Sequence, residues 1–544
     1  MRTLHKSLFL LLASFPVFAL HAVCADHGKK SGMAFQTSDR CMVCHNGLTT
    51  STGEDVSIGF HWRASVMANA SRDPYWQASS RRETIDHPES QAFIEDDCSV
   101  CHMPITRYEA KLRGKEGEIF SHLPFDPDHE SGQQAEDGVT CSVCHQIGKE
   151  KLGSRESFNG GFVVNPPDSH AQHPEYGPFD IQLGQQRIMR TSSGGFLPNK
   201  EDHIRKSELC ATCHTLYTKA LGRNGEQIGI LPEQVPYQEW LHSDYRDKQS
   251  CQECHMPEVQ EAVPIAKVLG VPRQGLHQHT FVAANFLLQN MLNRYRDDLS
   301  VEALPEELTS AAKGTIAYLQ AKAAHIDIDS LTVSAGRLQA DVFVENLGGH
   351  KFPTAYPSRR AWLHFTVQDR DHKTIFESGG LNPDGSIRGN DNDADPARFE
   401  PHYTEITNSG QVEIYEDILK DQQGHVTTGL LSAVGYIKDN RILPHGFDKT
   451  TADKDIAVYG AALNDAGFTD RGSRVRYSVA IPDAQGPLEV TAELWYEPIG
   501  YRWANNLKVY GKAAEPRRFN SFYDAMGPGA AVMLTRASIL LPGH

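Results

Sequence analysis

The chain has 544 residues, of which 39% are hydrophobic, and its formal net charge is −16 at pH 7. A chain of this length favours two or more domains. The acidic balance argues against binding to nucleic acid or to an anionic membrane surface, and it permits docking to basic protein partners.

Residues 1–25 have the pattern of a secretory signal peptide, in which basic residues precede an apolar run, Leu8–Leu20, and a cleavage site follows. The run is shorter than the ~20 apolar residues that cross a bilayer, and no later stretch approaches that length. We therefore expect a periplasmic or extracellular protein without a transmembrane segment in its mature chain. Cys24 is expected to leave with the signal, because a lipoprotein site needs a small residue where Val23 stands.

Ten of the eleven cysteines fall in five units of the form CxxCH. Two thiols separated by two residues can add to the two vinyl groups of one haem, and the next histidine then binds the iron from the proximal side. Zinc sites, redox pairs and disulfide frameworks also use CxxC, but none requires a histidine after every second cysteine. The sequence therefore predicts five covalently bound c-type haems. The attaching cysteines are Cys41, Cys44, Cys98, Cys101, Cys141, Cys144, Cys210, Cys213, Cys251 and Cys254, and the proximal ligands are His45, His102, His145, His214 and His255.

Residues 26–300 carry all five units, with little strand alternation and many Gly, Pro, Asp and Asn residues between them. This pattern predicts a domain of short helices and long loops, in which porphyrins replace a continuous side-chain core. Residues 301–325 are rich in Ala, Leu, Glu and Lys, with apolar residues at helical spacing, and predict a helix that connects two domains.

Residues 326–544 contain no CxxCH unit and alternate apolar with polar residues, which predicts a β-sandwich-like domain with long insertions. The fold class is therefore α+β, a mainly helical and loop multihaem cytochrome c domain followed by a β domain. The predicted strands are Leu331–Val333, Leu338–Val344, Trp362–Gln368, Thr374–Glu377, Val475–Ile481 and Leu488–Tyr496.

One insertion, Asn382–Pro396, combines aspartates with asparagines and glycines. Oxygen-rich loops bind calcium, so this loop is a candidate calcium site, although its spacing differs from that of an EF-hand. The alternative is a set of solvated turns.

The CxxCH units with their surroundings, Glu239–Ser243 before the fifth unit and His279–Asn285 after it, resemble multihaem cytochromes c of the group that includes hydroxylamine oxidoreductase and its tetrahaem electron acceptor. The β-domain stretch Gly349–Arg359 resembles a segment that follows the haem region in other multihaem cytochromes. The resemblance implies a distal histidine two residues after a Trp-x-x-Ser segment. The chain departs from this pattern twice, because Met67 and Tyr245 occupy the two positions.

The second axial ligand of each iron decides whether a haem carries electrons or binds substrate. Met67 could ligate iron or pack in a helix, and His61 and His242 lie close enough in sequence to replace either missing histidine. His350 follows a predicted strand in a glycine-containing turn, so we expect it to reach a haem of the first domain, against the alternative of a turn histidine. The remaining candidates are His203, His279 with its competitor His277, and the weaker His122 and His129.

Two functions compete. If most irons have two protein ligands, the chain is a pentahaem cytochrome that transfers electrons between other redox proteins. If one haem is five-coordinate, the chain is an oxidoreductase of a small nitrogen or sulfur compound. Uniform CxxCH units, abundant histidines and the lack of a compact acid–base cluster favour the carrier. The sequence does not predict the oligomeric state, and a structural or adhesive surface protein is the least favoured interpretation.

Overall fold

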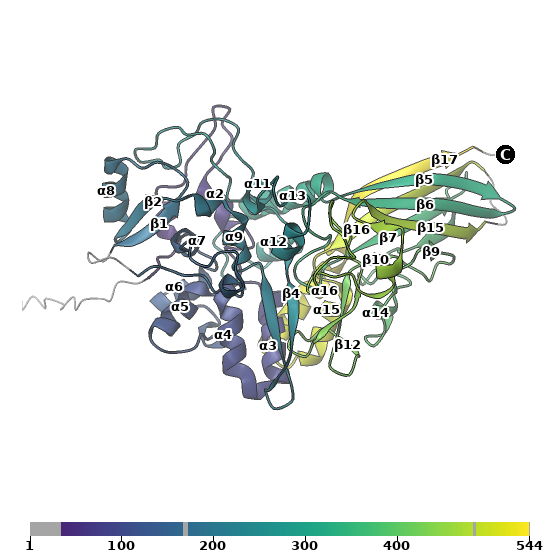
Figure 1. Ribbon diagram of the computed structural model, residues 1–544, viewed down its shortest axis with the longest axis horizontal. Coiled ribbons are helices and arrows are strands. Elements are labelled where there is room, and N and C mark those ends of the chain that lie inside the picture. Colours follow the sequence, from purple (N-terminus) through teal and green to yellow (C-terminus); the bar gives the residue numbers. More distant parts are fainter. Residues whose placement is uncertain (1–33, 167–171, 482–485, 543–544) are drawn as a thin grey trace, which may run out of the picture. The chain divides into compact units, whose positions relative to one another are not determined.

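The computed structural model describes residues 34–166, 172–481 and 486–542, which belong to one compact unit, Ala34–His544 (Figure 1). The predicted signal peptide and Cys24 lie outside these residues. Both helices and sheets are abundant, so the prediction of an α+β protein is confirmed.

Short helices separated by long connections make up the region that carries the CxxCH units. Each unit begins in or just before a helical turn, and the parallel pair β1–β2 and the hairpin β3–β4 lie between them. The helices are α1 (Asp39–Met42), α2 (Ile58–Arg63), α3 (Pro74–Asp86), α4 (Gln91–His102), α5 (Pro104–Leu112), α6 (Glu130–Glu136), α7 (Cys141–Gln146), α8 (Leu183–Ser192), α9 (Ser207–Ala211), α10 (Pro236–Leu241), α11 (Cys251–His255) and α12 (Phe286–Arg294). The strands are β1 (His173–Gly177), β2 (Phe196–Lys200), β3 (Leu216–Leu221) and β4 (Gln227–Gln234).

The connecting helix α13 (Pro305–Lys322) falls inside the predicted segment 301–325. Proline stands at its first turn, where no intrahelical N–H bond is lost, and Glu307 accepts the backbone N–H of Leu304 at 2.9 Å. The chain passes from this helix almost directly into strand β5. The domain boundary near residue 300 stays a prediction, because residues on both sides of it share one hydrophobic core.

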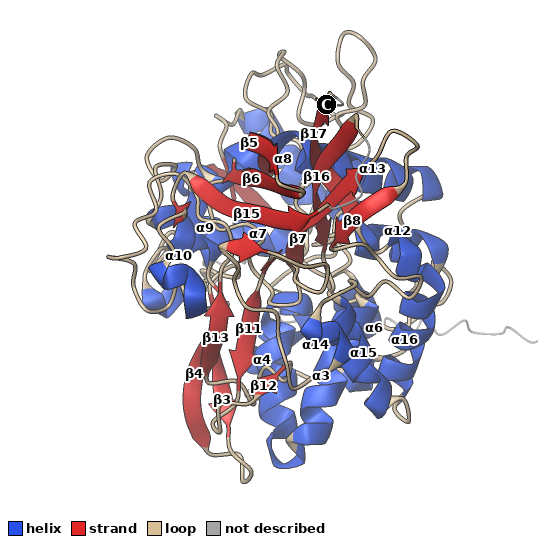
Figure 2. Cartoon of the chain, turned by 90° about the vertical axis from the view of Figure 1, so that its right-hand side faces the viewer, coloured by secondary structure: helices blue, strands red, loops and turns tan. Residues whose placement is uncertain are grey.

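Two five-stranded sheets form the β region, and Figure 2 shows their strands close together. In one sheet the order is β10 (Ile414–Tyr415), β7 (Arg360–Gln368), β16 (Leu488–Glu497), β17 (Val532–Leu541), with β8 (Thr374–Ser378) beside β7. In the other the order is β14 (Phe468–Thr469), β15 (Gly472–Ala480), β6 (Arg337–Asn346), β5 (Ala324–Ser334), with β9 (Glu405–Ile406) beside β15. All the predicted strand segments fall in these strands, except that Ile481 lies one residue past β15.

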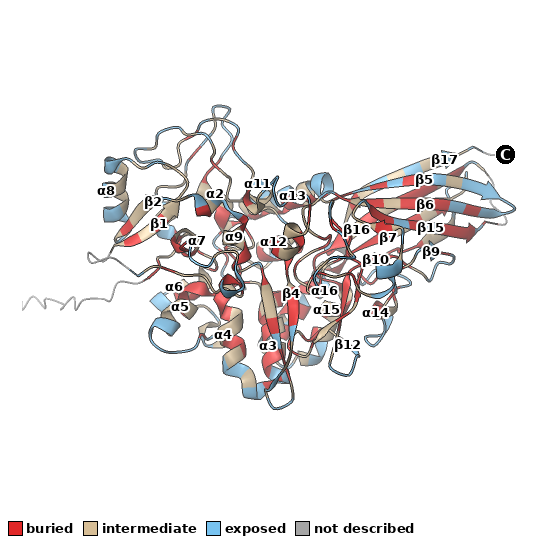
Figure 3. Cartoon of the chain, in the orientation of Figure 1, coloured by how far each residue is buried: buried red, intermediate tan, exposed pale blue. Residues whose placement is uncertain are grey.

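The two sheets bury their facing sides against each other. Buried and exposed residues alternate along β6 and β5, as the colours of Figure 3 show. Between the sheets the ring of Phe365 stacks on that of Tyr477, with centroids 3.9 Å apart. This packing is that of a sandwich. The remaining strands form a smaller sheet, in the order β12 (Val426–Thr427), β11 (Asp417–Lys420), β13 (Gly435–Asp439).

The last helix, α16 (Ala514–Met526), packs against α3 of the region that carries the CxxCH units. Arg81 forms two hydrogen bonds to Glu515, at 2.9 and 3.0 Å, and the ring of Tyr75 lies 5.1 Å from that of Phe519. The C-terminal part of the chain therefore helps to hold the helix that flanks the second CxxCH unit.

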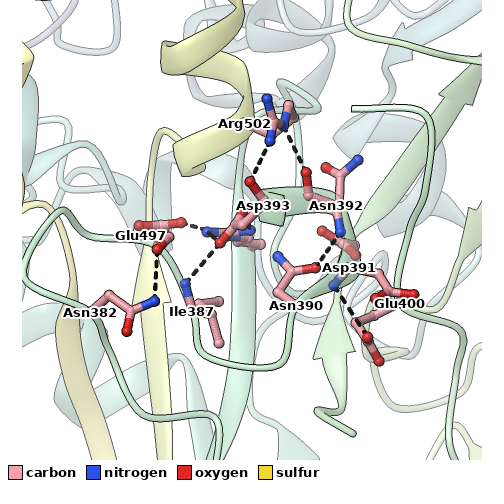
Figure 4. A network of polar contacts seen from close by, with 12 residues as sticks. Asn382, Ile387, Asn390, Asp391, Asn392, Asp393, Glu400, Glu497 and Arg502 are labelled. Atoms are coloured by element: carbon pink, nitrogen blue, oxygen red, sulfur yellow. Dashed lines mark hydrogen bonds and ion pairs between the residues drawn. The ribbon is translucent and has the colours of Figure 1, made fainter. Parts of the chain in front are cut away.

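The aspartate-rich loop Asn382–Pro396 forms the short helix α14 (Asp391–Ala394), and its central carboxylate faces an arginine. Both oxygens of Asp393 accept hydrogen bonds from Arg360, at 2.8 and 2.9 Å, and Arg502 of α15 (Tyr501–Asn506) donates to the Asn392 carbonyl at 2.7 Å (Figure 4). In the ranges that the structure describes, no three His, Cys, Asp or Glu side chains are placed to hold a metal ion. The loop supplies protein partners for its own carboxylate, and the geometry gives no support to the candidate calcium site.

Candidate haem sites

Four of the five proximal histidines donate Nδ1–H to a backbone carbonyl. The bonds run from His45 to Ile265 (2.6 Å), His102 to Ala70 (2.9 Å), His145 to Tyr176 (2.6 Å) and His255 to Val282 (2.6 Å). A proton held on Nδ1 leaves the lone pair of Nε2 free, which is the tautomer that binds a metal through Nε2. These histidines are therefore oriented as iron ligands.

Burial keeps all five proximal rings neutral. It lowers the pKa of His102 and of His255 to about 4, and it also lowers the pKa of His45, His145 and His214. Only a neutral imidazole can ligate a metal, so the donor chemistry fits a haem iron at each unit.

The ten cysteines of the units are all free thiols. At the fifth unit Ser250 and Glu253 form a capping box at the start of α11, with the Glu253 carboxylate accepting the Ser250 N–H at 2.6 Å. At the third unit the Thr140 side chain caps α7. Residues three apart lie on one face of a helical turn, so Cys251 and Cys254 present their thiols to the same side. This arrangement fits covalent attachment of one haem per unit.

Two proximal histidines face a second histidine ring. The ring centroids of His145 and His279 are 6.3 Å apart with 16° between the planes, and those of His255 and His350 are 6.2 Å apart with 14° between the planes. A bond between a metal and an imidazole nitrogen is about 2 Å long. Because each nitrogen lies about 1 Å from its ring centre, two ligands of one metal have centroids about 6 Å apart. Both pairs fit a single iron between the rings.

His279, rather than its competitor His277, faces His145. Burial lowers the pKa of His279 to about 3, and its Nδ1 bonds to the carbonyl of His277 at 3.0 Å. The Nδ1 of His277 bonds instead to the Met256 carbonyl at 2.6 Å.

His350 comes from the β region, on the turn that follows β6. The turn is tied to the segment after α10: Ser243 donates to the carbonyl of Gly349 at 3.0 Å, and the Tyr245 hydroxyl donates to the carbonyl of Leu347 at 3.0 Å. Tyr245 is the residue that stands where the resemblance implies a histidine. It therefore holds the turn that brings a histidine from elsewhere.

Glu239, on α10, holds the other side of the same turn. Its Oε2 accepts the backbone N–H of Lys351 at 3.1 Å and the hydroxyl of Thr354 at 2.6 Å, and its Oε1 lies 3.1 Å from Arg441. Lys351 is fully buried, with Nζ 2.7 Å from Asp439. Buried charges without partners are costly, so this network fixes the turn in one position.

The thiols of different units lie against one another in pairs. In the first pair the two thiols share a hydrogen bond, which raises the pKa of Cys41 and lowers the pKa of Cys141. A similar bond lowers the pKa of Cys251 to about 7. The three pairs are Cys41–Cys141, Cys210–Cys251 and Cys101–Cys213.

Cys144 of the third unit lies near both Cys210 and Cys213. A negative charge on its sulfur therefore raises the pKa of each. The units are thus linked in the order first, third and fourth, and the fourth contacts both the second and the fifth.

The other candidate distal residues have different surroundings. The Nδ1 of His61 is buried without a partner among the described residues, and burial lowers the pKa of this ring. His203 donates Nε2–H to the Ile147 carbonyl at 2.8 Å. Its buried Nδ1 is then the ring nitrogen left to bind an iron. His242 donates Nε2–H to the Asp448 carbonyl at 3.0 Å, so this nitrogen has no lone pair available for an iron.

Met67 lies in the turns between α2 and α3, where its carbonyl accepts the N–H of Val139 at 3.1 Å. Of the weaker candidates, His129 bonds to Asp126 at 2.7 Å on the surface, and burial lowers the pKa of His122.

Two residues near the haem sites, Trp76 and Arg359, were not among the site residues predicted from the sequence. The ring of Trp76, on α3, stacks on that of His102 with centroids 4.3 Å apart and 2° between the planes. Asp73 sets this position, because its side chain caps α3 by accepting the N–H groups of Tyr75 and Trp76. The cationic Arg359 lies near His214 and His255 and lowers the pKa of both.

The comparisons with known proteins agree with this geometry. A penta-haem cytochrome c552 from Thermochromatium tepidum has a similar structure, with a TM-score of 0.51 and 14% sequence identity over 94% of this chain and 100% of that chain. The fold is that of a multihaem cytochrome c. No protein-family model matches the chain, and no curated protein does. In the described ranges no helix of this multihaem fold is long and apolar enough to cross a bilayer.

Proposed function

We propose that this chain is an exported pentahaem cytochrome c that transfers electrons between other redox proteins. The facing rings of His255 and His350 carry the proposal, because an iron held between two imidazoles has no free position for a substrate and can only exchange electrons. The His145–His279 pair supports the same conclusion for a second haem.

The thiol pairs support an electron path. A haem is joined to the chain through these sulfur atoms, so contacts between thiols of different units bring the attached porphyrin edges close together. Electrons could then pass from the first unit through the third to the fourth, and from there to the second or the fifth. Because this order branches at the fourth unit, electrons could leave the protein from more than one haem.

We propose further that the chain carries five haems, loses residues 1–25 and functions in the periplasm or outside the cell. We also propose that it is related to the group of hydroxylamine oxidoreductase and its tetrahaem acceptor. Mass spectrometry of the mature protein from a host with haem-attachment machinery tests the number of haems and the loss of residues 1–25. Fewer than five haem masses, or a retained amino terminus, would overturn them.

Low-temperature EPR of the oxidised protein tests the function itself. Five low-spin signals are expected of a carrier. A high-spin signal that changes on addition of nitrite, hydroxylamine or sulfite would replace the carrier by an oxidoreductase of a small nitrogen or sulfur compound.

One observation favours that second function at the fourth unit. Arg359 brings a positive charge close to the ring of His214. A cation beside an iron with one protein ligand would attract an oxyanion.

A further inference from the structure

Five strongly exposed aliphatic side chains gather around the first CxxCH unit. They form what we call the apolar patch: Val43, Leu183, Val268, Leu269 and Val271, with exposed fractions of 77%, 74%, 49%, 60% and 46%. Exposed apolar groups that cluster at one place mark interaction sites more often than scattered ones do.

Hydrogen bonds join the segments of this patch. The backbone N–H of Lys267 donates to the carbonyl of Cys44 at 2.8 Å, which places Val268 and Leu269 beside the first unit. The Gln185 amide, on α8, donates to the carbonyl of Leu269 at 3.2 Å, and it accepts from Arg273 at 3.1 Å. The patch is therefore one surface and not a set of separate loops.

The patch lies behind the proximal histidine, away from the haem face. The carbonyl of Ile265 accepts the Nδ1–H of His45, so the segment that follows Ile265 leaves from the side of the ring opposite Nε2. Leu269 has a φ of 52°, a left-handed conformation that is rare for leucine, and it presents its side chain to solvent. The segment that carries Val268, Leu269 and Val271 therefore leaves the ring of His45 away from its iron-binding nitrogen.

The two segments that supply Leu183, Val268, Leu269 and Val271 carry a net positive charge, opposite in sign to that of the whole chain. Residues 178–190 and 264–275 contain four basic residues, Arg187, Arg190, Lys267 and Arg273, and one acidic residue, Asp180, in a chain with a net charge of −16. Asp180 is bound by Lys200 at 2.9 Å.

A hollow of about 460 Å³ opens beside the patch, and Val271 contributes to its wall. The guanidinium groups of Arg205 and Arg273 each lie 5.5 Å from the ring of Phe179, which also lines it. The surface thus combines an apolar centre, a shallow depression and a basic rim.

We propose that the apolar patch is the docking surface for a small acidic electron-carrier protein, which exchanges electrons with the haem of Cys41 and Cys44. The proposal rests on the electron-transfer function above and names the partner of that function. Transient redox complexes combine a desolvated apolar centre with complementary charges that steer the encounter. An acidic protein is repelled by most of this chain, so the basic rim selects this face for its approach.

Stopped-flow reduction of the haem-loaded, full-length protein tests the proposal. Photoreduced flavodoxin, a small acidic carrier, serves as the protein reductant, and hexaammineruthenium(II) serves as a small reductant that needs no docking surface. Leu269→Asp places a charge in the patch, and aspartate tolerates the left-handed backbone better than leucine does. Its rate constant with flavodoxin should fall at least tenfold, while its rate with the ruthenium complex stays at the wild-type value.

The charge is tested separately by the double variant Arg187→Glu, Arg190→Glu on the exposed side of α8. Its rate with flavodoxin at low ionic strength should fall, and the decrease of the wild-type rate with added salt should be lost. Val509→Asp is the matched control, because Val509 is 80% exposed and lies outside the patch. This variant should react as the wild type does.

Equal flavodoxin rates for the wild type and the two patch variants would overturn the proposal. So would a wild-type dimer in sedimentation that Leu269→Asp dissociates, since the patch would then join two copies of this chain. If neither reductant reduces any haem of the wild type, the electron-transfer function fails and the docking proposal fails with it. That result differs from a patch-independent reaction, which overturns the docking alone.

Discussion

The ring of His350 faces the ring of His255 across 6.2 Å, although the two residues belong to different halves of the chain. Glu239, Ser243 and Tyr245 hold the turn that carries His350, and all three precede the fifth CxxCH unit. The β region therefore supplies a group to the haem region and is not merely attached to it.

His350→Ala should convert one haem from low spin to high spin and leave the other four unchanged. The reason is that alanine removes the histidine ring that faces His255. EPR of the oxidised protein measures the change, and His242→Ala is the control, because the His242 ring bonds to the Asp448 carbonyl. An unchanged count of low-spin haems in His350→Ala would exclude iron ligation by this residue.

Glu239→Gln should lower the free energy of unfolding by about 2 kcal/mol, because a buried charged hydrogen-bond acceptor is replaced by a neutral one. The glutamine side chain keeps a carbonyl oxygen for the N–H of Lys351 but removes one of the three carboxylates beside the Arg441 cation, which keeps Asp417 and Asp439. Thermal unfolding of the haem-loaded protein gives the stability. The low-spin signal of the His350 haem should weaken as well; full stability with an intact signal would show that the turn does not depend on this carboxylate.

Much of this architecture follows from the sequence because its signals are local. The CxxCH spacing places two thiols and a ligand on one helical turn, and period-two alternation marks strands β5 to β8, β15 and β16. The short strands β9 to β14 and strand β17 were not predicted. The order in which the units contact one another is not local, so it could not be predicted. The stacking of Trp76 on His102 joins residues 26 positions apart and is not local either. His350 was accessible to sequence reasoning only as one of two alternatives, because its partner lies 95 positions away.

The aspartate-rich loop shows that composition alone does not identify a binding site. Its composition makes it a candidate cation site or a set of solvated turns, but Arg360, on strand β7, donates to both oxygens of Asp393. Composition reveals which groups are present and does not reveal which distant side chain reaches them.

Trp76→Leu should move the midpoint potential of one haem and leave the other four in place. The indole lies parallel to the proximal ring of His102 at 4.3 Å, so its π electrons contact the iron ligand directly. Trp76→Phe keeps a stacked ring and should give a smaller shift. Redox titration followed by absorption and EPR measures both variants; equal potentials in all three proteins would reduce Trp76 to a packing residue.

Met67→Ala and His61→Ala together identify the axial group near the first units. The buried, unpartnered Nδ1 of His61 favours the histidine, so His61→Ala should change one haem signal while Met67→Ala changes none. Near-infrared spectra settle the alternative, since methionine ligation of ferric haem has its own charge-transfer band. Loss of such a band in Met67→Ala would transfer the ligand role to methionine.

His402 makes the β region sensitive to pH. Both of its ring nitrogens face carboxylates, with Nδ1 2.7 Å from Glu413 and Nε2 3.0 Å from Asp465, and the ring is buried. Hydrogen bonds to Glu413 and Asp465 and the charges of both carboxylates outweigh burial and raise the pKa of His402. The folded-state pKa is thus above the unfolded value of about 6.5.

A group with a raised folded-state pKa stabilises the fold fully below its unfolded pKa, and this stabilisation is lost as the pH rises through the folded value. The free energy of unfolding should therefore decrease from about pH 6.5 upward, and His402→Gln should remove this part of the pH dependence. Melting temperatures measured between about pH 5 and 9 follow the effect. His325→Gln is the control, because His325 is exposed and forms its hydrogen bond with Asp327. If the wild type and His402→Gln have parallel profiles, the pair of carboxylates does not hold a charged imidazole.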